Sequence, residues 1–315
     1  MQVSPTGADS STVAIPGLPT TLSVSGIAAS ELAELLAGRA RPGDWLKMVG
    51  RPPIQVALEN ESAQAGGEET VQDLEDGRVV MRSGAPAAVA VEPEHRAPGF
   101  LLPESLRLAM SQQWARAGAI PVHGAVIVSG SVSVLVIGPK AAGKSILSAA
   151  ALAAGLSLVS DDWVLLGKDD QTRPGVWRMR RFVMLREGWA ANQLMALLPD
   201  IHFQHAGRPK RVFHLPEEAD ERFPARTHIN RIWLLERPGG SRRQHTTIEP
   251  APSAAALASL IEASMPLFFG SAFPHERQRL MATARDLLKD CECFRVVTGT
   301  ELVERPGGLL ELLGR

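Results

Sequence analysis

Residues 132–145 read VSVLVIGPKAAGKS, and this stretch decides how the whole chain is interpreted. Its last eight residues, Gly138 to Ser145, match the pattern GxxxxGK[ST]. The pattern has chemical meaning when a strand precedes it and a helix follows, because backbone N–H groups and the positive helix end then surround a phosphate. Val132 to Ile137 has the composition of a buried strand, and an Ala/Leu-rich helix is expected from Lys144 to Ala154. We therefore predict a phosphate-binding loop.

The loop predicts the cofactors and a role for each of its residues. The nucleotide contacts we expect are Gly138, Pro139, Lys140, Ala141, Ala142, Gly143, Lys144 and Ser145. Lys144 would reach the β- and γ-phosphate oxygens of ATP or GTP, and the Ser145 hydroxyl would bind Mg²⁺. We expect Lys144 to be a solvated side chain with little packing duty. The alternative is a glycine-rich turn whose lysine is merely a surface residue.

Two acidic residues follow the next predicted strand, Leu156 to Ser160. Asp161 and Asp162 stand at its carboxyl end, where open α/β sheets bind their ligands. One carboxylate can hold Mg²⁺ and the other can accept a proton from a hydroxyl, and their proximity raises the pKa of one of them. An isolated Asp-Asp pair is typical of a solvated turn. Its position after a phosphate loop favours the functional interpretation.

His123 and Gly124 begin the strand pair that leads into the loop. By itself, a histidine at the start of an apolar strand is more often packed or exposed than catalytic. Together with residues 134–145 and 155–162, however, His123-Gly124 resembles the kinase domain of bacterial HPr kinase/phosphorylase and its relatives, which include enzymes of ribosomal peptide biosynthesis. Weaker similarity runs from about Pro103 to the C-terminus.

This resemblance implies a fold and a set of roles. The expected fold class is α/β, with mixed α+β content, as a phosphoenolpyruvate-carboxykinase-like P-loop kinase domain. The resemblance assigns Asp161 as the base on an acceptor serine, and Asp162 and Ser145 as the metal side. It also implies that His123 supports the acids and the phosphate. Lys144 completes the expected catalytic set.

The sequence departs from that family at three places. The stretch Arg178 to Phe182 lacks the family's Glu-x-Arg-Gly signature, so we do not expect HPr recognition or the reverse, phosphorylase reaction. Lys140-Ala141 replaces a small polar residue and glycine within the loop, which could alter its conformation. The first 100 residues do not resemble the HPr kinase N-terminal domain.

Composition and charge limit the class of protein, its partners and its compartment. The 315 residues are 45% hydrophobic and 21% charged, a typical globular mixture rather than a disordered or fibrous one. Because the formal charge is -1, no general positive field attracts nucleic acid or a membrane, and neither is an expected partner. Cys291 and Cys293 do not make a disulfide framework, and no targeting signal is recognised at the start, so we expect a cytoplasmic protein.

The pattern along the chain predicts three parts. Residues 1–24 are expected to be a disordered tail, because they are rich in Ser, Thr, Pro and Gly. Residues 25–100 would form a small N-terminal α+β module with a long loop from Glu59 to Glu75, and residues 101–315 the kinase domain. Within the kinase domain, we expect strands at 176–185, 211–215, 229–236 and 293–297, and helices at 103–117, 187–198, 252–263, 275–289 and 300–313.

The favoured function is a kinase that transfers the γ-phosphoryl of ATP or GTP to a hydroxyl, most readily a serine of a peptide or protein, with a small molecule left open. The alternatives are a nucleotide-binding switch or slow NTPase that regulates a partner, and a non-catalytic relative with a damaged loop. Arg180-Arg181 and residues 207–211 are candidates for transition-state charge, although a solvated basic loop is the commoner use of such residues. The sequence is compatible with a homo-oligomer and does not decide the oligomeric state.

Overall fold

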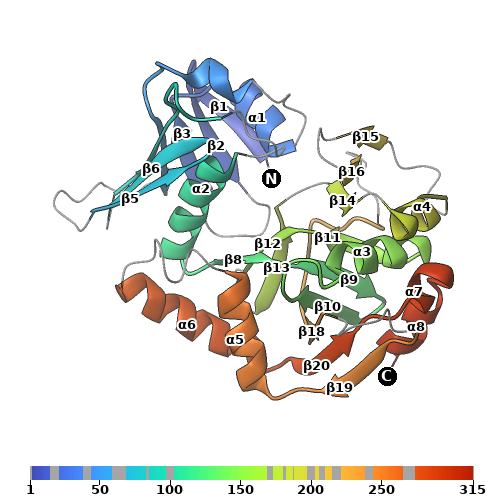
Figure 1. Ribbon diagram of the computed structural model, residues 1–315. Helices are drawn as coiled ribbons and strands as arrows, with labels where there is room; N and C mark the ends of the chain where they lie inside the picture. Colours follow the sequence, from blue (N-terminus) through green and yellow to red (C-terminus); the bar gives the residue numbers. More distant parts are fainter. Residues whose placement is uncertain are drawn as a thin grey trace. The chain divides into compact units, whose positions relative to one another are not determined.

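The protein has mixed α+β structure and divides into two compact units (Figure 1). The computed structural model describes residues 2–14, 21–37, 44–58, 69–82, 85–96, 103–168, 173–179, 182–186, 188–196, 203–205, 210–214, 221–237, 244–264 and 274–314. The first unit takes in the described parts of Met1–Pro121, Lys168–Thr172 and Met265–Thr283. The second takes in those of Val122–Gly167, Arg173–Ser264 and Ala284–Arg315.

The first unit is built on an antiparallel seven-stranded sheet. Its strands, in spatial order, are β1 (Gln2–Gly7), β2 (Ser10–Ala14), β3 (Thr21–Ser25), β4 (Ile54–Leu58), β7 (Ala87–Ala90), β6 (Gly77–Arg82) and β5 (Glu69–Leu74). Helix α1 (Ala29–Ala37) and the short 3₁₀ helix η1 (Trp45–Met48) lie between β3 and β4 in the chain. Helix α2 (Glu104–Arg116) contacts β4, β6 and β7, so it belongs to this unit rather than opening the next one.

The disordered tail expected over residues 1–24 is wrong, because β1, β2 and the start of β3 lie there. Val13, Leu22 and Val24 are fully buried, and the Ser and Thr residues around them are mostly half-buried. This is the alternation of a strand with one face on the core. The Ser/Thr-rich composition concealed it. Strand β5 likewise occupies the end of the stretch that was expected to be a long loop.

The N-terminus of α2 is capped by a carboxylate that is distant in sequence. Asp76 lies in the turn between β5 and β6 and is 4% exposed. Its Oδ1 accepts the Ser105 N–H at 3.1 Å and its Oδ2 accepts the Glu104 N–H. The Trp45 indole N–H donates to the backbone carbonyl of Asp76. These bonds satisfy N–H groups that a helix start leaves unpaired, and they place a negative charge at the positive end of the helix.

The second unit holds a six-stranded sheet and two smaller ones. The large sheet runs β11 (Ser157–Ser160), β9 (Ala125–Ser129), β10 (Val132–Ile137), β18 (Arg231–Leu235), β20 (Glu292–Val297) and β19 (Thr247–Pro250). The smaller sheets run β17 (Arg226–Thr227), β13 (Pro174–Arg178), β12 (Trp163–Lys168), β8 (Ile120–His123), and β14 (Phe182–Arg186), β16 (Lys210–His214), β15 (Phe203–His205). The helices of this unit are α3 (Lys144–Ala153), α4 (Trp189–Ala196), α5 (Ser253–Ala263), α7 (Glu301–Glu304) and α8 (Gly308–Leu313). Helix α6 (Pro274–Leu288) belongs to the first unit up to Thr283 and to the second unit from Ala284 on.

Most of the expected elements are present, and the differences have local causes. Strand β10 and helix α3 confirm the strand and helix predicted around the loop. The strand expected over 176–185 is two strands, β13 and β14, which belong to different sheets. The helix expected over 300–313 is interrupted between α7 and α8, where Pro306 cannot donate a helical hydrogen bond. None of the described helices is both long and apolar enough to span a membrane.

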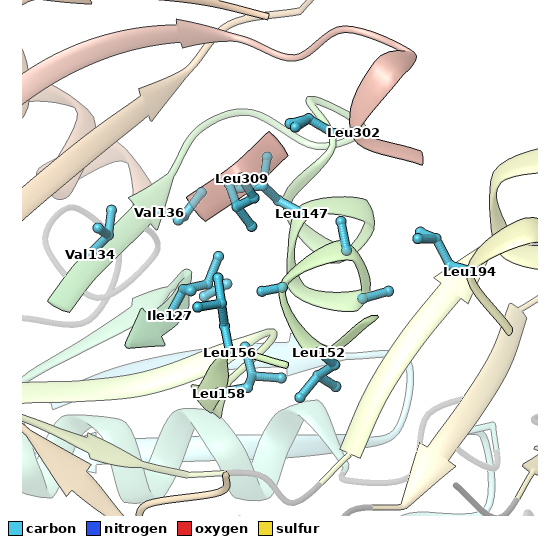
Figure 2. Close-up of a cluster of buried hydrophobic side chains, with 14 of the residues drawn as sticks. Ile127, Val134, Val136, Leu147, Leu152, Leu156, Leu158, Leu194, Leu302 and Leu309 are labelled. Carbon is cyan, nitrogen blue, oxygen red and sulfur yellow. The ribbon is translucent and has the colours of Figure 1, made fainter. Parts of the chain in front are cut away.

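Helix α3 is fixed to the large sheet by an apolar cluster (Figure 2). Ile127, Val134 and Val136 of the sheet and Leu147 of the helix are each at most 1% exposed. Leu302 and Leu309, from α7 and α8, belong to the same cluster. Because β10 is paired on both sides, antiparallel to β9 and parallel to β18, the start of α3 is held firmly relative to the strand that precedes it.

Replacing Asp76 with alanine should destabilise the first unit by about 1 to 3 kcal/mol, because two backbone N–H groups of α2 lose their acceptor. Asp73→Ala is the matched control on the same hairpin, since the Asp73 side chain is 63% exposed and makes a surface ion pair with Arg78. Its cost should stay below about 1 kcal/mol. Urea unfolding followed by circular dichroism measures both. Equal losses in the two variants would contradict the capping role.

Candidate functional site

The predicted phosphate loop lies between β10 and α3, as a strand–loop–helix arrangement requires. Its glycines are needed where they stand. A Cβ atom on Gly138 would lie 2.5 Å from the carbonyl oxygen of Leu235, at the end of the neighbouring strand. Gly143 has φ +108°, and a Cβ there would lie 3.1 Å from Thr298 Oγ1. The sequence pattern is therefore dictated by close backbone approach and by left-handed conformation.

A tight turn forms the middle of the loop. The Ala142 N–H donates to the Pro139 carbonyl at 3.2 Å, and Ala141 has φ +68°. No other described non-glycine residue has a positive φ. The loop thus keeps a left-handed residue at the position where Lys140-Ala141 departs from the resembled family. Successive backbone N–H groups in a turn of this kind can form an anion-binding concavity.

Lys144 lies inside the loop rather than in solvent. Its side chain is 6% exposed, and its Nζ donates to the carbonyls of Gly138 at 2.7 Å and Pro139 at 3.3 Å. The expectation of a solvated side chain is wrong, because the Lys144 ammonium is buried and forms hydrogen bonds to carbonyls at the start of the same loop. Burial lowers the pKa of Lys144, and the nearby Asp162 and Asp161 carboxylates oppose that shift.

Asp161 is a buried carboxylate close to Ser145 and Ser148 in the first turns of α3. It is 1% exposed, and its Oδ2 accepts the Met184 N–H from β14 at 3.1 Å. Its Oδ1 is buried and has no hydrogen-bond partner among the described residues. The pKa of Asp161 is raised to about 6, chiefly by burial and also by the neighbouring Asp162. The Ser148 hydroxyl, the Met184 N–H and the Ser145 hydroxyl oppose this shift.

The two serines near Asp161 leave its Oδ1 unsatisfied. Both hydroxyls are close enough to affect its pKa, yet neither completes a hydrogen bond to Oδ1. The Ser148 hydroxyl donates instead to the Lys144 carbonyl at 3.2 Å. A buried carboxylate oxygen without a donor is costly unless a cation or proton meets it. Together with the adjacent Ser145 hydroxyl, it supplies oxygen atoms of the kind that Mg²⁺ prefers.

Asp162 faces a different environment from Asp161. Its Oδ1 lies 3.1 Å from Nε2 of His123, and the two side chains are 23% and 47% exposed. The Gly124 N–H donates to the Asp162 carbonyl at 3.0 Å, which ties the end of β8 to the acid pair. A Cβ on Gly124 would lie 2.9 Å from the Val136 carbonyl oxygen, so glycine is required beside His123.

The turn that contains the two acids is shaped by a bulge before it and a hydrogen bond across it. Strand β11 has a bulge between Leu158 and Ser160 where it pairs with β9. The Ser160 hydroxyl then donates to the Trp163 carbonyl at 3.0 Å, across the acid pair. Bulges next to functional sites commonly redirect side chains. Here consecutive residues present one carboxylate to the buried interior and the other to His123.

The structure brings together His123, the loop and both acids, and it adds residues that the sequence did not single out. Met184 contributes a backbone donor from a separate sheet, which no sequence pattern signals. Arg237, just after β18, donates from Nε to the Lys140 carbonyl at 3.2 Å. Its place at the carboxyl end of a predicted strand beside the loop was a usable signal.

Most of the candidates for transition-state charge lie outside the described residues. The guanidinium of Arg178, which precedes Arg180-Arg181 in the chain, is described and donates to the Phe223 carbonyl at 2.8 Å. Arg180, Arg181, Arg208 and Pro209 lie outside the described part of the chain, and only the backbone is described for Lys210 and Arg211. Within the described residues, no group of three or more His, Cys, Asp or Glu side chains could hold a metal.

No known family model matches the chain, and a search of curated proteins found no match.

Proposed function

We propose that this protein is a Mg²⁺-dependent kinase that transfers the γ-phosphoryl of ATP or GTP to a hydroxyl, most readily on a serine of a peptide or protein. The observation that carries the proposal is the buried Lys144 ammonium, enclosed by loop carbonyls 2.7 and 3.3 Å away and facing an acid pair. A cation buried at the start of a helix, beside a left-handed loop, suits a bound phosphate chain.

The resemblance to HPr-kinase-like enzymes supports the finer fold assignment. The order of His123, the loop and the acid pair resembles that family, and all of these residues lie in the second unit. We propose the phosphoenolpyruvate-carboxykinase-like fold for this unit on that basis. The left-handed φ of Ala141 argues against a non-catalytic relative with a damaged loop.

In the proposed reaction, the chain's own residues position the nucleotide and manage one proton. Loop N–H groups and Lys144 would bind the phosphate oxygens. When bound, Mg²⁺ would neutralise negative charge on the phosphates. The acceptor hydroxyl would lose its proton to a carboxylate as its oxygen attacks the γ-phosphorus and the bond to the β-phosphate oxygen breaks. The products are the phosphorylated acceptor and a nucleoside diphosphate.

The geometry supports a division of labour between the acids that is opposite to the one implied by the resemblance. Asp161 is closed off from a bulky acceptor at 1% exposure, and its Oδ1 has no hydrogen-bond partner among the described residues. The Ser145 hydroxyl lies close enough to this carboxyl group to lower its pKa. We therefore propose Asp161 and Ser145 as the protein's metal side. Asp162 is more accessible and pairs with His123 at 3.1 Å, so this pair would receive the acceptor's proton.

Lys144→Ala should weaken binding of Mg·ATP by about 10- to 100-fold, because a charge-assisted contact to phosphate is lost. Lys289→Ala is the control, since Lys289 is a solvent-exposed lysine of the same unit that pairs with Asp286. It should bind within about threefold of wild type. Isothermal titration calorimetry measures both, and circular dichroism checks folding. A folded Lys144→Ala variant with wild-type affinity would remove the phosphate-loop assignment.

The two acids should respond differently to amide substitution. Asp162→Asn and His123→Ala should reduce phosphoryl transfer by about 10² to 10⁴, the usual range for lost general-base catalysis, while retaining Mg·ATP affinity. Asp161→Asn should instead raise the Mg²⁺ concentration needed for half-maximal nucleotide binding. Mg²⁺ titrations and single-turnover transfer rates separate the two effects. Identical behaviour of both Asn variants would refute the division of roles.

Asp161→Asn should stabilise the protein at pH 8 without Mg²⁺. The pKa of Asp161 in the folded protein is about 6, against an ordinary 3.8, so its ionisation opposes folding. Both states are protonated below the lower value; the folded state loses stability as pH rises through this window, and the full cost of at most about 3 kcal/mol applies above it. Asparagine has no such cost, so its advantage should vanish near pH 4.

Thermal unfolding at several pH values tests this prediction. Asp286→Asn, at a partly exposed carboxylate of the same unit that pairs with Lys289, should show no comparable gain at pH 8. Saturating Mg²⁺ should raise the melting temperature of wild type more than that of Asp161→Asn. If Asp161→Asn is no more stable than wild type at pH 8, Asp161 does not carry the buried charge described above.

A further inference from the structure

Arg237 makes one hydrogen bond to the loop, and it reaches the turn at its centre. Strand β18 runs parallel to β10, so both strands end at the same edge of the sheet, and Arg237 follows β18 there. Its Nε donates to the Lys140 carbonyl at 3.2 Å. Lys140 and Arg237 are both exposed, so this hydrogen bond buries little surface. Its effect on the loop must come from fixing the orientation of the peptide group whose carbonyl it binds.

The orientation of the Lys140–Ala141 peptide group distinguishes a type I from a type II β-turn. Residues 139–142 form a β-turn closed by the bond from the Ala142 N–H to the Pro139 carbonyl. A positive φ at the third position, where Ala141 has +68°, is the mark of a type II turn. Types I and II differ mainly by a flip of the central peptide, here Lys140–Ala141. Alanine disfavours the left-handed conformation, and glycine is the usual residue there.

Because a trans peptide is planar, its carbonyl and its N–H point in opposite directions. A donor that holds the Lys140 carbonyl therefore also fixes the direction of the Ala141 N–H. If the central peptide flipped to the type I orientation, the carbonyl would leave the Arg237 donor and the N–H would turn the other way. The bond from Arg237 thus favours the turn that alanine opposes.

We propose that Arg237 is a positioning residue that holds the phosphate loop in its left-handed, anion-binding conformation, in place of the glycine that position 141 lacks. The proposal rests on the proposed function only for the identity of the ligand. It differs from a direct contact between Arg237 and the phosphates. A positioning role disappears when residue 141 can adopt the left-handed conformation freely, whereas a direct contact does not.

Four proteins test this: wild type, Arg237→Ala, Ala141→Gly and the double variant. Arg237→Ala should weaken Mg·ATP binding about tenfold, as expected for losing a charge-assisted hydrogen bond. In the Ala141→Gly background, the same substitution should change affinity by less than about threefold, because glycine keeps the turn without help. Calorimetric titration gives the four dissociation constants. Arg295→Ala, at an exposed arginine that pairs with Glu236 just after β18, is the control and should bind as wild type does.

A second readout keeps this inference separate from the proposed function. Without nucleotide, Arg237→Ala should lower the melting temperature by about 2 to 4 °C, and by less than half of that in the Ala141→Gly background. If wild type binds no nucleoside triphosphate, the proposed function fails, and the melting temperatures still decide the role of Arg237. An unchanged affinity and melting temperature in Arg237→Ala would overturn the proposal. An equal loss with and without glycine at position 141 would also overturn it.

Discussion

A lysine ammonium that is nearly closed off from water must be matched by oxygen atoms, and the site is organised around that requirement at Lys144. Two loop carbonyls accept hydrogen bonds from it, and the acid pair partly opposes the lowering of its pKa by burial. Opposite charges interact strongly in such a weakly screened place, and each unmatched one is costly. Asp161 is the counterpart, a buried carboxylate whose Oδ1 meets no donor in the part of the chain that the structure describes. A phosphate chain with its Mg²⁺ would satisfy both groups at once, and this is why we propose nucleotide chemistry here.

The rest of the second unit fixes the positions of these charged residues. The apolar cluster under α3 fixes the helix start against β10 (Figure 2). The parallel strands β10, β18 and β20 end at one edge of the sheet. That edge supplies the loop itself, Arg237 after β18, and Thr298 after β20 against Gly143. Residues far apart in the chain therefore meet because parallel strands present their carboxyl ends together. The proposed function and the fold therefore both depend on these parallel strands ending at one edge of the sheet.

The sequence predicted the strand, loop and helix at residues 132–153 because glycine spacing and β-branched runs are local signals. The strands at the N-terminus were missed, because Ser and Thr on their outer face gave the segment the composition of a tail while Val13, Leu22 and Val24 were buried. The environments of Asp161 and Asp162 could not be predicted, since burial depends on β14 and β8, which pair in other sheets. Arg237 was within reach of prediction, as it follows a strand that the sequence did predict.

The central claim is that the loop from Gly138 to Ser145 receives the phosphates of a nucleoside triphosphate. A crystal structure with Mg²⁺ and a non-hydrolysable ATP analogue tests it most directly. The account predicts the β-phosphate within the concavity of loop N–H groups, in contact with Lys144 Nζ, and Mg²⁺ in contact with Ser145 Oγ and Asp161 Oδ1. An analogue bound elsewhere, with the loop empty and Lys144 still bonded only to the carbonyls of Gly138 and Pro139, would contradict it.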